Sequence, residues 1–357
     1  MRWDNLRLVE PSGRETMSVP LFEQGAVLRR FDTPEFRGIT FYEVRARSII
    51  NRVPEASRVP FRWTINPYRG CSHACLYCFA RNTHTYLDLD YGEDFNSQIV
   101  VKVNAAELLR KELAARTWKG EHIAMGTNVD PYQRAEGRYR LMPGILEALR
   151  DVANPFSILT KGSLILRDLD LLQQCADVTD VGANVSVGFV DRDMWRLLEP
   201  GTPSPQTRLN VCRKLNEAGI ECGVLMAPII PFLTDAPEQL EATVRAIAAS
   251  GATHVGPIVL HLRTGAREWF MGWLQEHHPE LVGRYERLYG ARAYAPKAFQ
   301  EEISGRVHEL AERFGVGPRG PRDARRIRER TAVAEAAGRM RDEPAEQLSL
   351  IDPVSGP

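Results

Sequence analysis

Three cysteines lie within eight residues of the stretch NPYRGCSHACLYCFAR (66–81). Cys71, Cys75 and Cys78 follow the spacing C-x3-C-x2-C. Thiolates are soft ligands that suit zinc or an iron–sulfur cluster. Structural zinc sites usually draw their ligands from two separated pairs, and the sequence holds no second close pair of cysteines. His73 would then have to be the fourth zinc ligand, and one short loop rarely wraps four ligands around an ion.

The other reading is a [4Fe–4S] cluster, which usually binds four thiolates. Three thiolates leave one iron without a protein ligand, so a small molecule can occupy that iron. The remaining cysteines, Cys175, Cys212 and Cys222, lie singly and far from the motif. In a reducing compartment, clustered cysteines favour a metal site over a disulfide framework.

The composition sets broad limits on function. Of 357 residues, 43% are apolar, which is enough for a large core, and the formal net charge is zero. The overall charge therefore points to neither a nucleic acid nor a membrane, although residues 317–341 hold eight arginines and three acidic residues. Without an apolar run of membrane-spanning length or a signal-peptide pattern, we expect a cytoplasmic protein with no membrane partner.

Six short apolar segments alternate with longer amphipathic ones and supply the frame for the cysteine loop. We expect strands at 62–66, 122–126, 156–160, 181–189, 220–228 and 254–262. Apolar residues recur with helical spacing at 104–116, 142–153, 164–176, 204–219 and 236–251. This alternation predicts an α/β fold, a partial (β/α)6 TIM-like barrel whose functional residues gather at the carboxyl ends of the strands.

Four regions are expected along the chain. Residues 1–60 form an N-terminal extension that packs on the core, and residues 61–263 form the barrel. Residues 264–316 read as a helical cap. Residues 317–357 are rich in Arg, Ala, Gly and Pro with few aromatic residues, which predicts a disordered tail.

The spacing C-x3-C-x-aromatic-C, with Tyr77 as the aromatic residue, resembles the motif of the radical S-adenosylmethionine (SAM) superfamily. The longer string around it is similar to the spore photoproduct lyase-like, or DNA repair photolyase-like, branch. The resemblance implies a radical SAM-type barrel with the [4Fe–4S] cluster on Cys71, Cys75 and Cys78, and SAM on the open iron. It also implies cleavage of SAM to a 5′-deoxyadenosyl radical that abstracts hydrogen from a substrate.

The resemblance implies a set of SAM contacts at the strand ends. Thr127 and Asp130 match the branch's Thr-x-x-Asp-Pro-Tyr-Gln segment after the second strand, and Lys161 matches a lysine that helps to hold the SAM carboxylate. The strand phase turns Asn184 and Ser186 into the barrel, where a hydroxyl and an amide suit a ribose. Ser186 also matches a serine that the relatives use for SAM.

The sequence departs from spore photoproduct lyase at one position that matters for the substrate. That enzyme returns a hydrogen atom from a cysteine on its second strand, whereas the stretch HIAMGTNVDPYQ (122–133) contains none. Tyr132 is the alternative hydrogen donor there. Glu199 and Arg208 match a Glu-Pro…Arg pattern of the branch, for which we expect a structural ion pair.

The tail suggests a partner. Gln347–Ile351 (QLSLI) is similar to the short peptide that bacterial replication proteins insert into the sliding clamp, which usually ends in Phe. Arg-rich arms often present such ligands. The resemblance to radical SAM enzymes further implies an external electron donor such as flavodoxin or ferredoxin.

These observations predict a radical SAM enzyme acting on an unidentified substrate, with nucleic acid as one candidate through DNA repair or base modification. The alternative is a non-enzymatic binding module with a zinc or cluster site, recruited to DNA by its C-terminal arm. The open fourth ligand position and the inward polar groups favour the enzyme, because a binding module needs neither.

Overall fold

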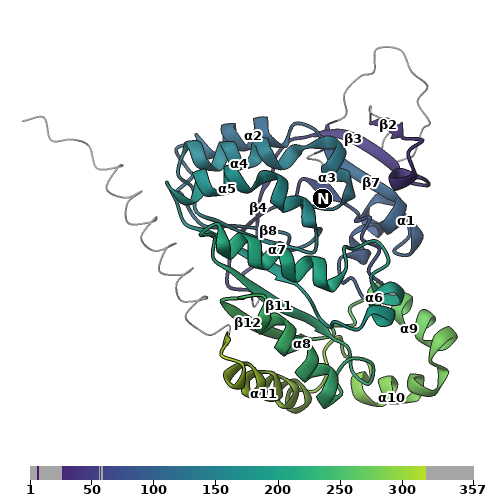
Figure 1. Cartoon of the computed structure of the whole chain (residues 1–357). Coiled ribbons are helices and arrows are strands. Elements are labelled where there is room, and N and C mark those ends of the chain that lie inside the picture. The colour runs from purple at the N-terminus through teal and green to yellow at the C-terminus, as the bar shows by residue number, and fades with distance from the viewer. Residues whose placement is uncertain (1–5, 8–25, 56, 58, 319–357) are drawn as a thin grey trace, which may run out of the picture.

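A computed structural model describes residues 6–7, 26–55, 57 and 59–318 of the chain (Figure 1). Its larger sheet has eight strands in the order β13-β12-β11-β10-β9-β8-β5-β4. Their bounds are β4 (Ile50–Arg52), β5 (Trp63–Ile65), β8 (Ile123–Met125), β9 (Phe156–Thr160), β10 (Val181–Ser186), β11 (Cys222–Ile229), β12 (His254–Val259) and β13 (Gly317–Pro318).

The six strands from β5 to β12 in this sheet are those predicted from the sequence. Each pairs in parallel with the next one along the chain. Parallel neighbours bring their carboxyl ends to the same edge, so the loops after the strands meet there. The expected α/β fold, a partial barrel of radical SAM type, is confirmed. Because β5 and β12 are not paired, the barrel is open on one side.

Helices cover the outer face of this sheet (Figure 1). The predicted helices are α2 (Ala105–Leu113), α4 (Leu141–Asp151), α5 (Leu169–Ala176), α7 (Pro205–Glu217) and α8 (Pro237–Ala249), with a 3-10 turn η5 (Ser163–Asp168) leading into α5. Ser204 caps α7 by accepting a hydrogen bond from Thr207 N, and Pro205 opens the helix. Gly219 and Gly251 follow α7 and α8 with φ of 80° and 71°, the left-handed conformation that favours glycine.

A second sheet was not predicted. Its strands are β1 (Leu6–Arg7), β2 (Val27–Arg30), β3 (Thr40–Ala46), β6 (Tyr68–Arg69) and β7 (Gln98–Lys102). The extension contributes β1, β2 and β3, while β6 and β7 come from the range expected to form only the barrel. β6 directly precedes the cysteine loop, so this loop starts in the second sheet.

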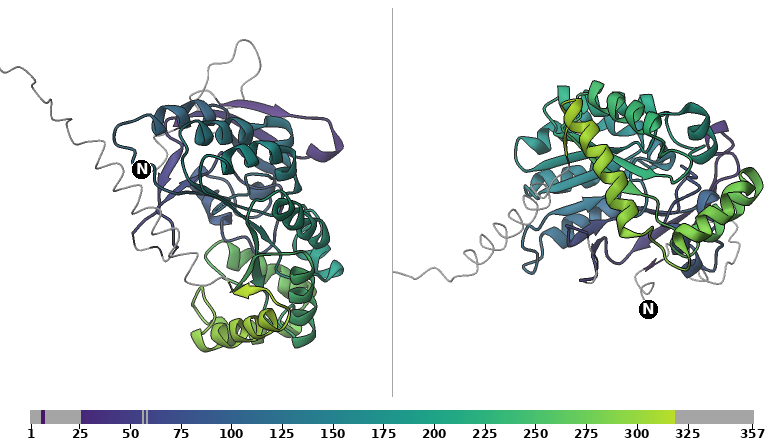
Figure 2. Two further views of the ribbon diagram at one scale, coloured as in Figure 1. Left: turned by 60° about the vertical axis from the view of Figure 1, so that its left-hand side comes forward. Right: turned by 90° about the horizontal axis from the view of Figure 1, so that it is seen from below.

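Three helices follow the last barrel strand: α9 (Ala266–His277), α10 (Pro279–Tyr289) and α11 (Lys297–Arg313). Figure 2 shows α11 running across one end of the molecule, beside α8. The remaining short helices are η2 (Pro34–Phe36), η3 (Arg81–Thr83), η4 (Thr85–Leu87), α1 (Glu93–Ser97), α3 (Arg134–Tyr139) and α6 (Arg192–Leu198). Among the described residues, no helix is both long and apolar enough to cross a bilayer.

Candidate active site

The cysteine loop is buried between the ends of the two sheets. Cys71 and Cys75 are 7% and 8% exposed, and Cys78 is partly exposed. Gln133, in the loop after β8, holds the start of the cysteine loop, because its Oε1 accepts from Ser72 N at 2.9 Å and its Nε2 donates to Gly70 O at 2.9 Å.

Two further contacts fix the middle of the loop from the other side. Leu76 N donates to Leu198 O, and Gly201 N donates to His73 O, both at 3.0 Å. A Cβ on Gly201 would lie 2.1 Å from Ser72 O, so only glycine permits this approach. The loop after β10 therefore braces the cysteine loop.

Arg81 fixes the end of the cysteine loop. This role of Arg81 was not predicted from the sequence. Its fully buried guanidinium donates to Cys75 O at 2.9 Å and to Gly92 O at 2.8 Å. It also lies 4.9 Å from the Trp269 ring centroid, which adds a cation–π contact. The only signal for this role was the position of Arg81, three residues after Cys78.

The donor set of three cysteine thiols on one loop suits an iron–sulfur cluster. Among the residues the structure describes, no three His, Cys, Asp or Glu side chains converge closely enough to hold one metal ion. A [4Fe–4S] cluster is larger than a single metal ion, so its thiol ligands lie around it and do not converge on one point. Burial raises the pKa of all three cysteine thiols, that of Cys75 to about 12, so binding of a metal must displace their protons.

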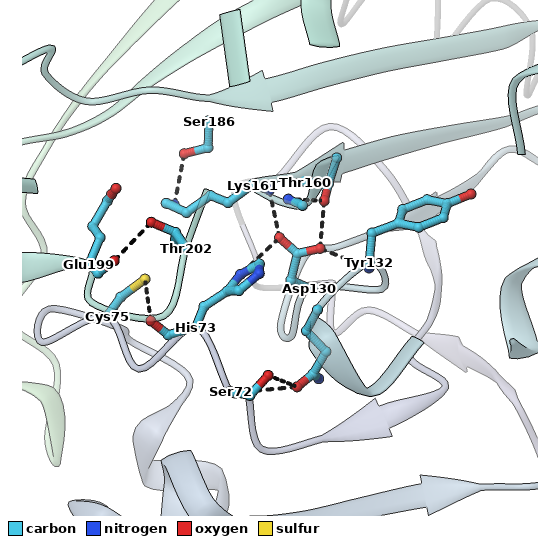
Figure 3. A network of polar contacts seen from close by, with 12 residues as sticks. Ser72, His73, Cys75, Asp130, Tyr132, Thr160, Lys161, Ser186, Glu199 and Thr202 are labelled. Carbon is cyan, nitrogen blue, oxygen red and sulfur yellow. Dashed lines mark hydrogen bonds and ion pairs between the residues drawn. The ribbon is translucent and has the colours of Figure 1, made fainter. Parts of the chain in front are cut away.

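Asp130 is the centre of a hydrogen-bond network at the ends of β8 and β9 (Figure 3). It accepts from Thr160 Oγ1 and Lys161 N, each at 2.6 Å, and from Tyr132 N at 2.9 Å. Its Oδ2 lies 3.4 Å from Nδ1 of His73, which sits between two of the cysteines. Burial alone would raise the pKa of Asp130, but His73 and these hydrogen bonds lower it.

Lys161 extends from the end of β9 across the barrel mouth toward β10 (Figure 3). Its Nζ donates to Ser186 Oγ at 2.9 Å, and Ser186 Oγ donates to Ala227 O at 2.9 Å. The ammonium also lies 5.8 Å from the Tyr77 ring centroid, the aromatic residue between Cys75 and Cys78. An ammonium and a hydroxyl therefore face the cysteine loop.

The expected ion pair between Glu199 and Arg208 is present and fully buried. Glu199 also accepts a hydrogen bond from Tyr77 Oη, and Arg208 donates to Ser186 O at 2.7 Å. Burial by itself would raise the pKa of Glu199, but Arg208 and Lys161 lower it, so the carboxylate is charged. The pair thus ties the cysteine loop to β10.

Three predicted residues lie outside this network or at its edge. Asn184 Oδ1 pairs with His254 Nε2 at 2.9 Å, at the start of β12 and therefore away from the strand ends. Thr127 is half-buried in the turn after β8. The Tyr132 ring points away from Cys75 in Figure 3, although its backbone joins the Asp130 network. Contacts of all three with SAM or substrate stay predictions.

The chain thus combines a partial β/α barrel with a three-cysteine loop after the first barrel strand. Comparison with models of protein families identifies the class that has these features. Residues 65–247 match the model of the radical SAM superfamily, and the chain belongs to that superfamily. It is therefore an enzyme, as predicted, rather than a non-enzymatic binding module. Its family implies a [4Fe–4S] cluster and SAM as cofactors, and a source of electrons.

Two relatives illustrate how far the sequence similarity reaches. The uncharacterized protein Rv2578c of Mycobacterium tuberculosis is 48% identical over 297 residues, which are 83% of this chain and 87% of the relative. The uncharacterized protein MJ0683 of Methanocaldococcus jannaschii is 32% identical over 199 residues, 55% of this chain and 70% of the relative.

Solved structures of spore photoproduct lyase share the fold. One, complexed with dinucleoside spore photoproduct, has a TM-score of 0.60 and 17% identity over 78% of this chain and 80% of its own. Another, a mutant with bound AdoMet and the same dinucleoside, has a TM-score of 0.57 and 17% identity, and the match covers 74% of this chain and 77% of that one. The expected resemblance to spore photoproduct lyase is thus confirmed for the fold.

The tail lies outside the described residues from residue 319 onward, and this includes Gln347–Ile351. Clamp binding, flavodoxin or ferredoxin as the electron donor, and cytoplasmic location all stay predictions.

Proposed function

We propose that Cys71, Cys75 and Cys78 hold the [4Fe–4S] cluster, that Lys161 and Ser186 hold SAM, and that the substrate is a nucleic acid with a damaged or modified base. When bound, these cofactors supply a 5′-deoxyadenosyl radical, which removes a hydrogen atom from the substrate. The chain's own residues bind SAM, orient it and keep water away from the reacting atoms.

The observation that carries the SAM assignment is the Lys161–Ser186 contact of 2.9 Å above the cysteine loop. The Lys161 ammonium donates to a neutral hydroxyl and lies near an aromatic ring, while the nearby Glu199 carboxylate is paired with Arg208. A carboxylate is a stronger partner for this ammonium than a hydroxyl, because attraction between opposite charges adds to the hydrogen bond. Ser186 would then turn its hydroxyl to the ribose.

The Asp130 network positions Lys161 for this task. Asp130 accepts from the backbone N–H of Lys161 and from Thr160, so it fixes the backbone where β9 ends. The oxygens of Asp130 are already engaged by four donor groups, which supports a positioning role beside the direct SAM contact that the sequence predicted.

A nucleic acid substrate is supported by the shared fold with a lyase whose complex contains a dinucleoside. The absence of a cysteine from 122–133 argues against the hydrogen-return step of that enzyme. We therefore place this chain with enzymes that act on a nucleic acid base other than the spore photoproduct.

The test uses the full chain, reconstituted with iron and sulfide under anoxic conditions and supplied with SAM and dithionite. Release of 5′-deoxyadenosine is measured alone and with DNA, RNA, peptide and small-metabolite fractions of a cell extract. We expect slow release alone and faster release with a nucleic acid fraction. No release by a protein loaded with about four irons per chain would refute the enzyme assignment, and acceleration only by peptides or metabolites would refute the substrate.

A further inference from the structure

The open side of the barrel is spanned by two segments that are far apart in the sequence. Phe79 directly follows Cys78 in the loop after β5, and Arg263 follows β12 at the other side of the opening. The Arg263 guanidinium lies 5.5 Å from the Phe79 ring centroid. A Cβ on Gly265 would lie 3.2 Å from Asn82, so the two backbones also approach closely.

Tyr294, between α10 and α11, completes this group. Arg263 Nη2 donates to Tyr294 Oη at 2.6 Å, and the guanidinium lies 5.8 Å from the Tyr294 ring centroid. His261 packs against the Tyr294 ring, with 4.6 Å between the two ring centroids. Phe79, Arg263 and Tyr294 are here called the barrel-mouth platform.

The platform is exposed although its rings are large and apolar. Phe79 and Tyr294 are each 42% exposed, and they are two of only a few large hydrophobic side chains with such exposure among the described residues. Burial and the nearby Arg263 lower the pKa of His261 to about 4, so its ring is neutral and adds no charge at neutral pH. The exposed surface therefore combines two partly exposed aromatic rings with one guanidinium that contacts both of them.

This combination matches a planar aromatic ligand that carries an anion. Bases stack on aromatic side chains and on arginine planes, and arginine pairs with phosphate through a fixed fork of donors. A base inside a duplex has both faces covered by its neighbours, so only an unpaired base can stack on the platform.

We propose that the barrel-mouth platform binds an unpaired nucleobase of the substrate, stacked on Phe79 or Tyr294, with Arg263 contacting a flanking phosphate. This inference rests on the nucleic acid substrate proposed above. It adds that the substrate is single-stranded, or is flipped out of a duplex, at the position that reacts. The platform adjoins Cys78, so a base bound there lies at the mouth of the same site.

The test measures binding of a short fluorescein-labelled oligothymidylate to the reconstituted full chain with SAM, by anisotropy, as the single strand and as a duplex with oligodeoxyadenylate. We expect tighter binding of the single strand. Phe79→Leu and Tyr294→Leu should each weaken it by about tenfold, since stacking of one base on an aromatic ring contributes that much or more. Tyr86→Leu, which alters another exposed aromatic residue, should change nothing.

Arg263→Gln should weaken binding and make the plot of log affinity against log salt less steep by about 0.7, the value for one phosphate contact to a single strand. Arg245→Gln is the matched control, because Arg245 is also exposed and stacked, on Phe314 at 5.4 Å, but lies on α8. Tyr294→Phe keeps the ring and removes the hydroxyl that holds Arg263. Circular dichroism and iron content show whether each variant is folded and loaded.

The outcomes separate the two proposals. If the parent chain releases 5′-deoxyadenosine and binds the single strand, but the platform variants bind it equally well, the platform inference is wrong and the proposed function stands. Equal or tighter binding of the duplex also overturns the inference. If the loaded parent releases no 5′-deoxyadenosine, the proposed function fails regardless of what binds.

Discussion

His73 Nδ1 lies 3.4 Å from Asp130 Oδ2, and both side chains are almost completely buried. The contact joins a residue between two cysteines to the loop after β8. Since Asp130 also accepts from Lys161 N, one carboxylate links the proposed cluster site to the proposed SAM site. Asp130 thus helps to hold the two cofactor sites in a fixed relation, together with the Glu199–Arg208 pair.

Replacement of Asp130 should therefore weaken the fold of the whole site. Asp130→Asn keeps one acceptor but turns an amide NH2 toward groups that themselves donate. We expect a loss of about 1–3 kcal/mol in the free energy of unfolding, the cost of an unsatisfied buried polar group. Urea denaturation of the metal-free chain measures it, with the exposed Asp177→Asn as control. Equal stability of the two variants would show that Asp130 is not the centre of the network.

The three cysteines of the motif should differ sharply from the other three. We expect Cys75→Ala to lose the brown colour, most of the iron and all release of 5′-deoxyadenosine. Cys175→Ala should keep all three, because Cys175 is buried on α5 away from the loop. Iron and zinc analysis after anoxic reconstitution provides the measurement. One zinc per chain, or unchanged iron in Cys75→Ala, would contradict the assignment.

Lys161 should determine the affinity for SAM. Lys161→Gln removes the ammonium that we assign to the SAM carboxylate, and a charged hydrogen bond contributes about 1.5–3 kcal/mol. We therefore expect SAM to bind at least about tenfold more weakly, as measured by equilibrium dialysis with the reconstituted chain. Lys214→Gln, on the exposed face of α7, is the control. An unchanged affinity in a variant with normal iron content would remove Lys161 from the SAM site.

The buried side chains of Glu199 and Arg208 should stabilise the fold only when both are present. Arg208→Met leaves the Glu199 carboxylate buried without its counter-charge, which costs about 3–5 kcal/mol. Replacing both, as Glu199→Gln with Arg208→Met, should recover part of this loss. Thermal or urea unfolding of the two single variants and the double variant gives the coupling energy. Strictly additive losses would mean that the two side chains do not depend on each other.

Lys102, at the end of β7, should give the stability a distinct dependence on pH. Burial first, and then Arg69, lower the pKa of Lys102 to about 7, despite the opposing effect of Glu112. The unfolded chain holds this proton up to about pH 10.4, so between these values the unfolded state binds more protons. The free energy of unfolding should therefore rise with pH across that window.

Lys102→Met tests this dependence, because it removes the titrating group and keeps a side chain of similar length. The variant should be more stable than the parent at neutral pH, and its stability should be flatter between pH 7 and about 10. Lys111→Met, on the exposed side of α2, should retain the slope of the parent. Parallel curves for the parent and Lys102→Met would show that folding does not lower the pKa of Lys102.

The barrel could be predicted from the sequence because its signals are local. Each βα unit shows its own change of hydrophobic period, and Gly219 and Gly251 mark helix ends by a backbone requirement. The cysteine spacing carries its chemistry within eight residues. The second sheet has no such signal, because β7 pairs with β3, which lies far away in the chain and outside the βα alternation.

The supports of the site were hidden for a related reason. Arg81 and Gln133 bind backbone atoms, which every residue offers, so no pattern of residue types marks their targets. Asp130 was predicted as a SAM contact from its match to the Thr-x-x-Asp-Pro-Tyr-Gln segment, while its contact with His73 depends on how two loops meet in space. Asn184 was predicted from the alternation of side chains along its strand, but it lies at the level of His254, below the strand ends.

The enclosure of the cysteine loop has a consequence for how the protein acquires its metal. Cys71 and Cys75 have almost no solvent access. The loop that carries them is held by backbone contacts from Leu198 and Gly201, by side-chain contacts from Arg81 and Gln133, and by flanking strands in two sheets. A carrier protein that delivers preassembled iron and sulfide cannot reach those two thiols in the closed chain. We therefore expect loading of the cluster to need an open form of this loop, either during synthesis or in a transient opening of the folded chain.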